Sequence, residues 1–211
     1  MTFGPLTIHF DERVLRPRPW TLAQAQWGSE LARTAGDGSI VELCAGVGHI
    51  GLAMARECAD QGRPRALILV DADPHACHLA RINASEALLP ATTQVRHGRI
   101  DTAIQPDERF AVMLADPPWV PSEQTGLYPA DPLSAIDGGD ADGLDLAREC
   151  VRVIGLHLAS SGSSILQVGT TQQAAAIAQH VDDNGDLGLS VAEIRDVVDA
   201  NGVLLLLTRG R

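Results

Sequence analysis

A glycine-rich turn provides the first group of residues whose types and spacing suit ligand binding. An apolar run ending at Cys44 leads through Ala45 into Gly46, Gly48 and Gly51, spaced as GxGxxG. Glycines at this spacing form a tight strand-to-helix turn, where a ligand can approach the backbone at a helix N-terminus. Asp71 ends the next apolar run, and its carboxylate is suited to accept both hydroxyls of a ribose. The pattern predicts a ligand that contains a nucleoside, although a turn that serves only helix–strand packing has the same spacing.

Glu42 helps to separate the two nucleoside ligands that fit this turn, NAD and S-adenosylmethionine. An acidic side chain just before the glycines faces a pyrophosphate unfavourably, whereas it suits the cationic amino group of a methionine moiety. Cys44, Ala45 and Ala72 adjoin the same positions and are further cofactor-binding candidates, with packing as the alternative role of Cys44. His49 lies inside the turn, where it either touches the cofactor or is exposed at the helix start.

A second group of residues follows a later apolar strand. Asp116, Pro117, Pro118 and Trp119 come directly after Phe110–Ala115. Two prolines end the strand rigidly at its carboxyl end, where open α/β sheets bind ligands. The turn exposes a carboxylate and a carbonyl that together can hold an –NH2 group and aim its lone pair at a methyl group, while the indole offers a flat face for stacking. This motif favours the methyl donor over NAD; the structural alternative is a proline-stiffened surface turn.

Two other segments are candidates for substrate contact. Arg18 and Trp20 lie in a proline-rich stretch that either covers the cofactor site or serves packing alone. Tyr128, the one tyrosine of the chain, lies in the segment 119–136, which carries three prolines. Because loops of this length inside compact domains tend to be functional, we expect this segment to shape the substrate pocket.

Short apolar runs and amphipathic stretches alternate along the chain, as in a parallel sheet covered on both faces. The expected strands are Ser39–Cys44, Ala66–Asp71, Thr93–His97, Phe110–Ala115 and Ser163–Gly169, and the expected helices are His49–Gln61, Pro74–Ala87, Leu144–Ala159 and Thr171–Val181. Leu189–Val198 and Val203–Arg209 flank Asn201-Gly202, a hairpin signal, so one antiparallel strand should close the sheet. The sequence predicts an α/β, Rossmann-like fold with a seven-stranded, mostly parallel sheet and helices on both faces.

The first 37 residues do not follow this alternation of apolar runs and amphipathic stretches. Leu6–Phe10 and Arg13–Arg16 are expected to pair as a small hairpin, and the following Arg-Pro-Arg-Pro-Trp stretch to be irregular, because proline lacks an N–H. Thr21 is expected to cap a helix that runs to about Ala35. We expect a single domain over 1–211, with a flap and helix in 1–37 and a Rossmann-like core in 38–211.

Composition narrows the function classes. The formal net charge is −11, which repels phosphate backbones and makes nucleic acid a less favoured partner. All 16 basic residues are arginine, a bias typical of a GC-rich bacterial genome. Cys44, Cys58, Cys77 and Cys150 form no CxxC pair, which favours reduced thiols in the cytoplasm. No spacing predicts a metal site, and no stretch predicts a secretion signal or a membrane span. The oligomeric state is left open.

As a set, the motifs resemble class I S-adenosylmethionine-dependent methyltransferases that modify planar nitrogens, and more closely the HemK/PrmC family of protein-glutamine methyltransferases. The acidic-Leu-x-x-Gly-x-Gly turn and the (Asn/Asp)-Pro-Pro-(aromatic) motif carry the likeness. Further similar stretches are Arg16–Thr21, matching a Pro-Arg-Pro-Glu-Thr segment; Asp137–Leu144, matching Gly-Gly…Asp-Gly-Leu; and Val70-Asp71 with Ala80 and Asn83-Ala84. The likeness covers roughly residues 5–210.

The resemblance implies S-adenosylmethionine as cofactor, S-adenosylhomocysteine as product, and a role for each matching residue. Glu42, Gly46 and Gly48 would hold the methionine part, Asp71 the ribose, and Asp101 the adenine amino group with Ile100 beside the ring, while Asp116 and the Pro117 carbonyl would orient the substrate nitrogen.

Two departures from the family bear on the substrate. Asp116 stands where the HemK/PrmC family has Asn. An Asp at this position resembles adenine-N6 and guanine-N2 methyltransferases instead. The bacterial release-factor enzymes also carry an N-terminal helical domain, for which this chain has no room. The resemblance predicts methylation of a protein glutamine amide. The alternatives are a nucleobase, a small metabolite amine, and a non-catalytic, cofactor-binding subunit of a larger complex.

Overall fold

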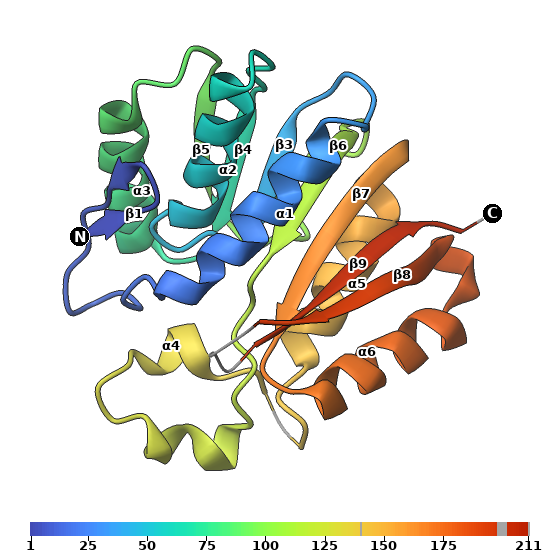
Figure 1. Ribbon diagram of the computed structural model, residues 1–211. Helices are drawn as coiled ribbons and strands as arrows, with labels where there is room; N and C mark the ends of the chain where they lie inside the picture. Colours follow the sequence, from blue (N-terminus) through green and yellow to red (C-terminus); the bar gives the residue numbers. More distant parts are fainter. Residues whose placement is uncertain (140, 198–201, 211) are drawn as a thin grey trace.

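The computed structural model describes residues 1–139, 141–197 and 202–210, and its centre is a seven-stranded sheet in the order β5-β4-β3-β6-β7-β9-β8 (Figure 1). The strands are β3 (Ile40–Leu43), β4 (Leu67–Asp71), β5 (Thr93–His97), β6 (Phe110–Ala115), β7 (Leu158–Val168), β8 (Leu189–Asp196) and β9 (Val203–Arg209). Pairing is parallel from β5 to β7, and β9 pairs antiparallel with both β7 and β8. The predicted sheet, with β9 as its antiparallel strand, is confirmed.

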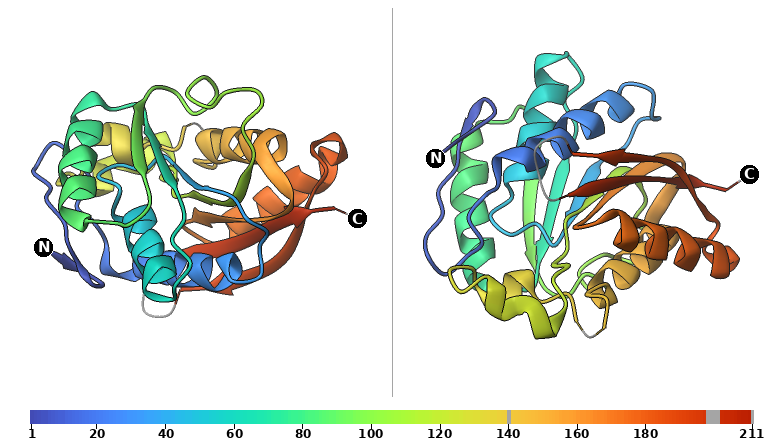
Figure 2. Two further views of the ribbon diagram at one scale, coloured as in Figure 1. Left: turned by 90° about the horizontal axis from the view of Figure 1, so that it is seen from above. Right: turned by 60° about the horizontal axis from the view of Figure 1, so that its bottom comes forward.

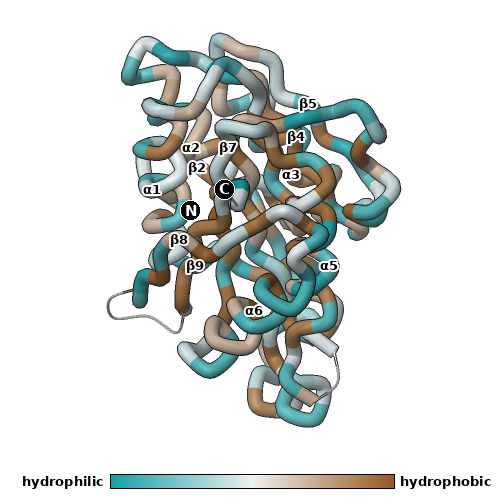
Figure 3. Tube along the Cα trace, turned by 90° about the vertical axis from the view of Figure 1, so that its right-hand side faces the viewer, coloured by the Kyte–Doolittle hydropathy of each residue, from teal (hydrophilic) through white to brown (hydrophobic). Residues whose placement is uncertain are grey.

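Helices cover both faces of the sheet because its central strands are apolar on both sides. The long helices are α1 (Leu22–Ala32), α2 (His49–Asp60), α3 (Pro74–Ala87), α5 (Asp145–His157) and α6 (Thr171–Asp183). Side chains of α1, α2 and α3 form one hydrophobic cluster with the sheet, and those of α5 and α6 form a second cluster. Figure 3 shows the hydrophobic colouring concentrated along strands such as β9. This burial explains why the strands read as continuous apolar runs.

The carboxyl ends of β3, β4 and β6 meet at one edge of the sheet, the lower edge in Figure 1. The segment after β6 lies along this edge and contains η2 (Ser122–Leu127) and the short helix α4 (Leu133–Ile136); the right view of Figure 2 brings it forward. The segment predicted as a loop over 119–136 therefore carries helical turns of its own.

The N-terminal prediction was wrong in its pairing. The small hairpin joins β1 (Thr2–Phe3) and β2 (Leu6–Thr7), so the start of the expected Leu6–Phe10 segment pairs with the residues before it and not with Arg13–Arg16. Pro19–Thr21 form a 3-10 turn, η1, because proline's fixed φ and missing N–H are compatible with the first position of a helix. Thr21 donates its hydroxyl proton to the Arg18 carbonyl instead of capping α1.

The start of β7 also differs from its prediction. The strand was expected from Ser163, but it begins at Leu158, immediately after α5 ends at His157. Leu158 pairs with Phe110 and the register then shifts, so that Ser163 pairs with Val112. This early start depends on long-range pairing that local sequence patterns do not reveal. The predicted β8–β9 hairpin is confirmed in its pairing, whereas its turn residues Asp199, Ala200 and Asn201 lie outside the described residues.

Candidate functional site

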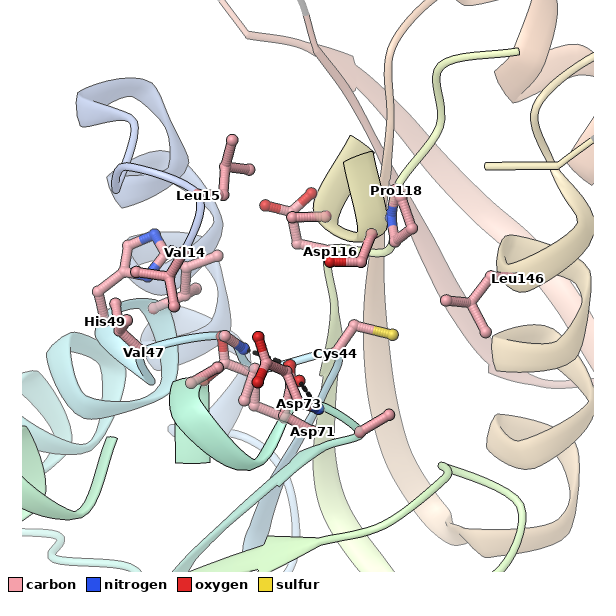
Figure 4. A pocket seen from close by; sticks show the side chains of 18 of the residues that line it. Val14, Leu15, Cys44, Val47, His49, Asp71, Asp73, Asp116, Pro118 and Leu146 are labelled. Carbon is pink, nitrogen blue, oxygen red and sulfur yellow. Dashed lines mark hydrogen bonds between the residues drawn. The ribbon is translucent and has the colours of Figure 1, made fainter. Parts of the chain in front are cut away.

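A cavity of about 660 Å³ opens at the carboxyl ends of β3, β4 and β6. Ten of the predicted site residues line it: Arg18, Glu42, Cys44, Ala45, Gly46, Asp71, Ala72, Ile100, Asp116 and Pro118. Figure 4 shows Asp116 and Pro118 across the cavity from Asp71 and Asp73. Residues far apart in the sequence thus converge where open α/β sheets bind ligands.

The glycine turn brings Glu42 onto the N-terminal end of α2. The Gly51 backbone N–H donates to Glu42 Oε2 at 2.9 Å, and a Cβ at Gly51 would lie 2.5 Å from that oxygen, so only glycine permits the approach. Gly48 has a φ of +79°, and a Cβ there would lie 2.6 Å from Leu69 Cδ1. The GxGxxG spacing therefore reflects both a left-handed turn and close packing.

Glu42 is 1% exposed, and its Oε1 atom has no hydrogen-bond partner among the described residues. Burial raises the pKa of Glu42 well above its usual range; the Gly51 N–H opposes this rise, and the Asp116 and Asp71 carboxylates add to it. Because an unpaired buried carboxylate is costly, a cationic ligand group at this position would stabilise the site.

Asp71 is held by backbone donors. The Gly46 N–H donates to Asp71 Oδ2 at 2.6 Å and the Asp73 N–H donates to Oδ1 at 2.8 Å, as drawn in Figure 4. Burial raises the pKa of Asp71, and these two bonds oppose the rise. The carboxylate is therefore fixed against the turn that carries the first glycine, at the point where a ribose is expected.

Asp116 faces the cavity from the end of β6. Its Oδ1 atom accepts a hydrogen bond of 2.8 Å from Gln167 Nε2, and burial raises its pKa to about 7. A carboxyl group with this pKa can exchange a proton near neutral pH. None of the ion pairs among the described residues involves Glu42, Asp71 or Asp116, so these three carboxyl groups line the cavity without a cationic side-chain partner.

Several predicted site residues are not part of the cavity lining: Gly48, Asp101, Pro117, Trp119, Trp20 and Tyr128. Asp101 accepts a bond of 3.1 Å from Arg99 Nε, which lowers the pKa of its carboxyl. The Trp119 ring packs so closely on Gly169 that a Cβ at Gly169 would lie 2.2 Å from Trp119 Cε3. Tyr128 is 38% exposed, within the segment that borders the site.

The N-terminal stretch contributes more of the lining than the sequence suggested. Arg13, Val14, Leu15 and Arg16 line the cavity, and Figure 4 shows Val14 and Leu15 on the same side as His49. Arg13, Val14 and Leu15 belong to no motif, so only the fold reveals them, whereas Arg16 begins the Arg16–Thr21 stretch. Asn83, on α3, anchors this stretch: its Nδ2 donates to the carbonyls of His9 and Val47 at 3.0 and 2.9 Å.

His49 lines the cavity and is partly buried, so it is not the exposed histidine that was one prediction for its position, whereas its contact with a cofactor stays a prediction. Burial lowers the pKa of His49 to about 3, so the ring is neutral at pH 7. Thr21 Oγ1 already donates its proton to the Arg18 carbonyl, so it accepts from His49 Nε2 at 3.2 Å. This contact joins the proline-rich stretch to the glycine turn.

Two side chains tie the segment after β6 to the rest of the molecule. Gln173 Nε2 donates to the carbonyls of Trp119 and Asp142 at 2.7 and 2.8 Å. Arg18 donates to Asp131 Oδ2 at 2.6 Å, which links the N-terminal stretch to this segment. These contacts span long sequence separations, and of the residues that make them only Arg18 lines the cavity.

The Cys44 thiol points toward α5 in Figure 4. A hydrogen bond with Cys150 and burial raise the pKa of Cys44 well above its usual range, so the thiol stays protonated. All four cysteines are free. Within the described ranges, no group of three or more His, Cys, Asp or Glu side chains is arranged to hold a metal ion, and no helix is both long and apolar enough to cross a membrane.

The order and directions of the strands are those of the class I methyltransferase fold. A solved methyltransferase from Pyrococcus furiosus superposes with a TM-score of 0.66 at 16% identity, covering 99% of this chain and 91% of that structure. The sequence also matches the Methyltransferase small domain family over residues 29–130.

More particular likenesses point to the HemK/PrmC type. The release factor glutamine methyltransferase of Mycolicibacterium smegmatis is 32% identical over 186 residues, covering 83% of this chain and 61% of that protein. The ribosomal protein uL3 glutamine methyltransferase of Francisella tularensis subsp. tularensis is 27% identical over 182 residues, covering 82% of this chain and 55% of that protein. The chain thus spans a little over half of each relative's length. These comparisons confirm the resemblance to class I methyltransferases of the HemK/PrmC type.

Proposed function

We propose that this chain is an S-adenosylmethionine-dependent N-methyltransferase that methylates the side-chain amide of a protein glutamine. The observation that carries the proposal is the cavity itself, in which Glu42, Asp71 and Asp116 converge at the carboxyl edge of a methyltransferase sheet. The two similar proteins named above, one acting on release factors and one on a ribosomal protein, support a protein glutamine as the acceptor.

The residues of the cavity fit the proposed cofactor. The unpartnered Glu42 Oε1 atom suits the ammonium group of the methionine part, and the fixed Asp71 carboxylate suits the ribose hydroxyls. By resemblance, Gly46 also holds the methionine part and Ile100 lies beside the adenine ring. When bound, the cofactor supplies a methyl group made electrophilic by its sulfonium centre.

The chain's own residues then orient the acceptor and hold a proton. Asp116 and the Pro117 carbonyl accept hydrogen bonds from the acceptor –NH2 group, which aims its lone pair into the cavity. Pro117 and Pro118 stiffen this turn, so little reorganisation is needed at the moment of transfer. No covalent enzyme intermediate is required, because proximity and alignment supply most of the acceleration.

The proposal also covers the extent of the domain, the cellular compartment and the source of the protein. We infer one methyltransferase unit over 1–211, with a flap and helix in 1–37 and the core in 38–211; the continuous sheet supports this division. The four free cysteines support a reduced, cytoplasmic protein, and the bacterial relatives together with the absence of lysine support a bacterial source.

A labelling experiment tests the proposed function. Purified chain and methyl-labelled cofactor are incubated with lysate of the source organism, and the products are treated separately with protease and nuclease. Label released by protease but not by nuclease, followed by methylglutamine in peptide maps, is the expected result. The Asp116→Ala variant serves as the control that separates this enzyme from endogenous methyltransferases.

Other outcomes identify the alternatives. Asp116 favours a nucleobase, since this carboxylate begins the corresponding motif in adenine-N6 methyltransferases, and label released by nuclease would establish that substrate. Label that stays in the small-molecule fraction would establish a metabolite amine. Cofactor binding without transfer to any fraction would indicate a non-catalytic subunit and overturn the enzymatic proposal.

A further inference from the structure

Gln167 is a buried polar side chain beside Asp116 that the chemistry described above does not use. It lies on β7, is 2% exposed, and donates from Nε2 to Asp116 Oδ1 at 2.8 Å. The parallel register pairs Ala115 of β6 with Leu166 of β7. Asp116 and Gln167 are the residues that follow these two, so the register places them side by side. The contact therefore follows from sheet register across 51 residues of sequence.

The Gln167 amide makes the two oxygens of Asp116 unequal. Oδ1 is occupied by an N–H donor, and the carboxyl group as a whole faces the cavity. An ionised carboxylate attracts the N–H side of an amide and repels its oxygen, so charge sets the orientation of the Gln167 group. When Asp116 takes up a proton, Oδ2 is the oxygen free to carry it.

We propose that Gln167 is a positioning residue that directs the acceptor nitrogen's proton to Asp116 Oδ2. The proposal rests on the proposed methyltransferase function and adds the atom that accepts the proton. As the nitrogen forms its bond to the methyl carbon, the carbon–sulfur bond breaks and its electron pair stays on sulfur. The N–H bond of the methylated nitrogen is then given up, and the proton forms an O–H bond at Oδ2.

Other titratable side chains line the same cavity as Asp116, among them Asp73, Glu149, His49 and Arg18. Glu42 on β3 and Asp71 on β4 are acidic neighbours in the same cavity, and Cys44 in the glycine turn stays protonated. The neighbours on α1 and β7 are the neutral amides Gln24 and Gln167. Gln167 is therefore the neighbour whose replacement changes the local hydrogen bonding of Asp116 without removing a charge.

Two variants test the role, and a matched glutamine controls for burial. Gln167→Leu removes the donor, and Gln167→Glu places a second carboxyl group against Asp116. Gln24→Leu is the control: Gln24 on α1 is also buried, but its Nε2 donates to the backbone carbonyls of Ala115 on β6 and Ile165 on β7, both at 3.0 Å. Turnover against pH, cofactor affinity by calorimetry and thermal unfolding are measured for each.

The expected results separate positioning from stability. Gln167→Leu should lower kcat roughly tenfold with cofactor affinity within about threefold of the parent value. Gln167→Glu should move the pH midpoint of kcat upward by about one unit or more, because two adjacent carboxyl groups share a proton. Gln24→Leu should lower thermal stability and keep the parent midpoint. Parent kcat and midpoint in both Gln167 variants would overturn the proposal.

A spectroscopic readout distinguishes failure of this inference from failure of the proposed function. In ¹H–¹⁵N spectra of the free protein, the Gln167 side-chain amide signal, assigned by its loss in Gln167→Leu, should shift with pH. Its midpoint should match that of the parent kcat, and Asp116→Asn should abolish the shift. An amide signal that ignores pH would refute the Asp116–Gln167 coupling even in an active enzyme. Absence of turnover with an intact titration would instead refute the methyltransferase assignment.

Discussion

The two halves of the cavity hold their carboxyl groups in different ways. In the half built on β3 and β4, Glu42 is bound by the Gly51 N–H and Asp71 by the N–H groups of Gly46 and Asp73. In the half built on β6, Asp116 is bound by the side-chain amide of Gln167 from another strand.

This difference shows which half can change without loss of the fold. Backbone donors are fixed once the strand and turn form, whatever side chains surround them. Side-chain donors can be replaced by a single substitution. We therefore expect cofactor binding to tolerate substitutions of the side chains around the turn. The acceptor half, in which Gln167 holds Asp116 and Gln173 holds the Trp119 carbonyl, is where substitutions can change specificity.

The largest expected effect comes from a substitution in the acceptor half, which should lower turnover without changing cofactor binding. Asp116→Ala should lower kcat by about 10³-fold, because the acceptor nitrogen loses its orienting carboxylate and its proton acceptor. Cofactor affinity should stay within about threefold of the parent value when measured by calorimetry. Full turnover in this variant would show that the β6 half does not orient the acceptor.

A packing change tests how the segment after β6 is seated. Gly169→Ala would place a Cβ against the Trp119 ring, and we expect a loss of about 3 kcal/mol in the free energy of unfolding. Thermal unfolding should therefore shift downward by roughly 6–12 °C. Gly126→Ala is the matched control, since a Cβ there meets nothing within 4 Å. Equal melting temperatures for the two variants would contradict the tight Trp119 contact.

The corresponding change in the other half should affect binding alone. Asp71→Ala removes a buried, hydrogen-bonded carboxylate, and we expect cofactor affinity to fall about 100-fold, close to 2.7 kcal/mol. Asp101→Ala should have a smaller effect, because its carboxylate pairs with Arg99 and is not part of the cavity lining. Calorimetry with both variants decides the point, and unchanged affinity in Asp71→Ala would refute the cofactor assignment.

The smallest effect concerns stability against pH. Burial raises the pKa of Asp116 from 3.8 to about 7, so the folded state binds more protons than the unfolded state between these values. Stability should fall as pH rises through this window, by about 2 kcal/mol between pH 5 and pH 7 from this group alone. Asp116→Asn should remove that contribution in denaturant titrations. The same pH slope in both proteins would place the titrating group elsewhere.

Much of the fold, and of the half of the cavity built on β3 and β4, could be predicted from local sequence. Apolar runs such as Phe110–Ala115 mark strands that are buried on both faces, and the glycine spacing marks the turn. Gly51 is required because Glu42 approaches it, and both residues lie within one strand–turn–helix unit. Short-range geometry was sufficient there, because the same few residues form the turn and bind through it.

The acceptor half could be predicted only in part, because its contacts join distant segments. The Asp-Pro-Pro-Trp motif predicted the position of Asp116, but not that Gln167 would hold it or that the Trp119 ring would pack on Gly169. The lining contributed by Val14 and Leu15 follows no motif either.

The sequence by itself thus determined the order of strands and helices, the glycine turn and the acidic residues that end the strands. Only the tertiary structure decided which side chains surround Asp116 and how the N-terminal stretch closes the cavity. The physical reason is the range of the interactions. Periodicity and turn geometry act over a few residues, whereas sheet register and packing bring Asp116 to Gln167 across 51 residues.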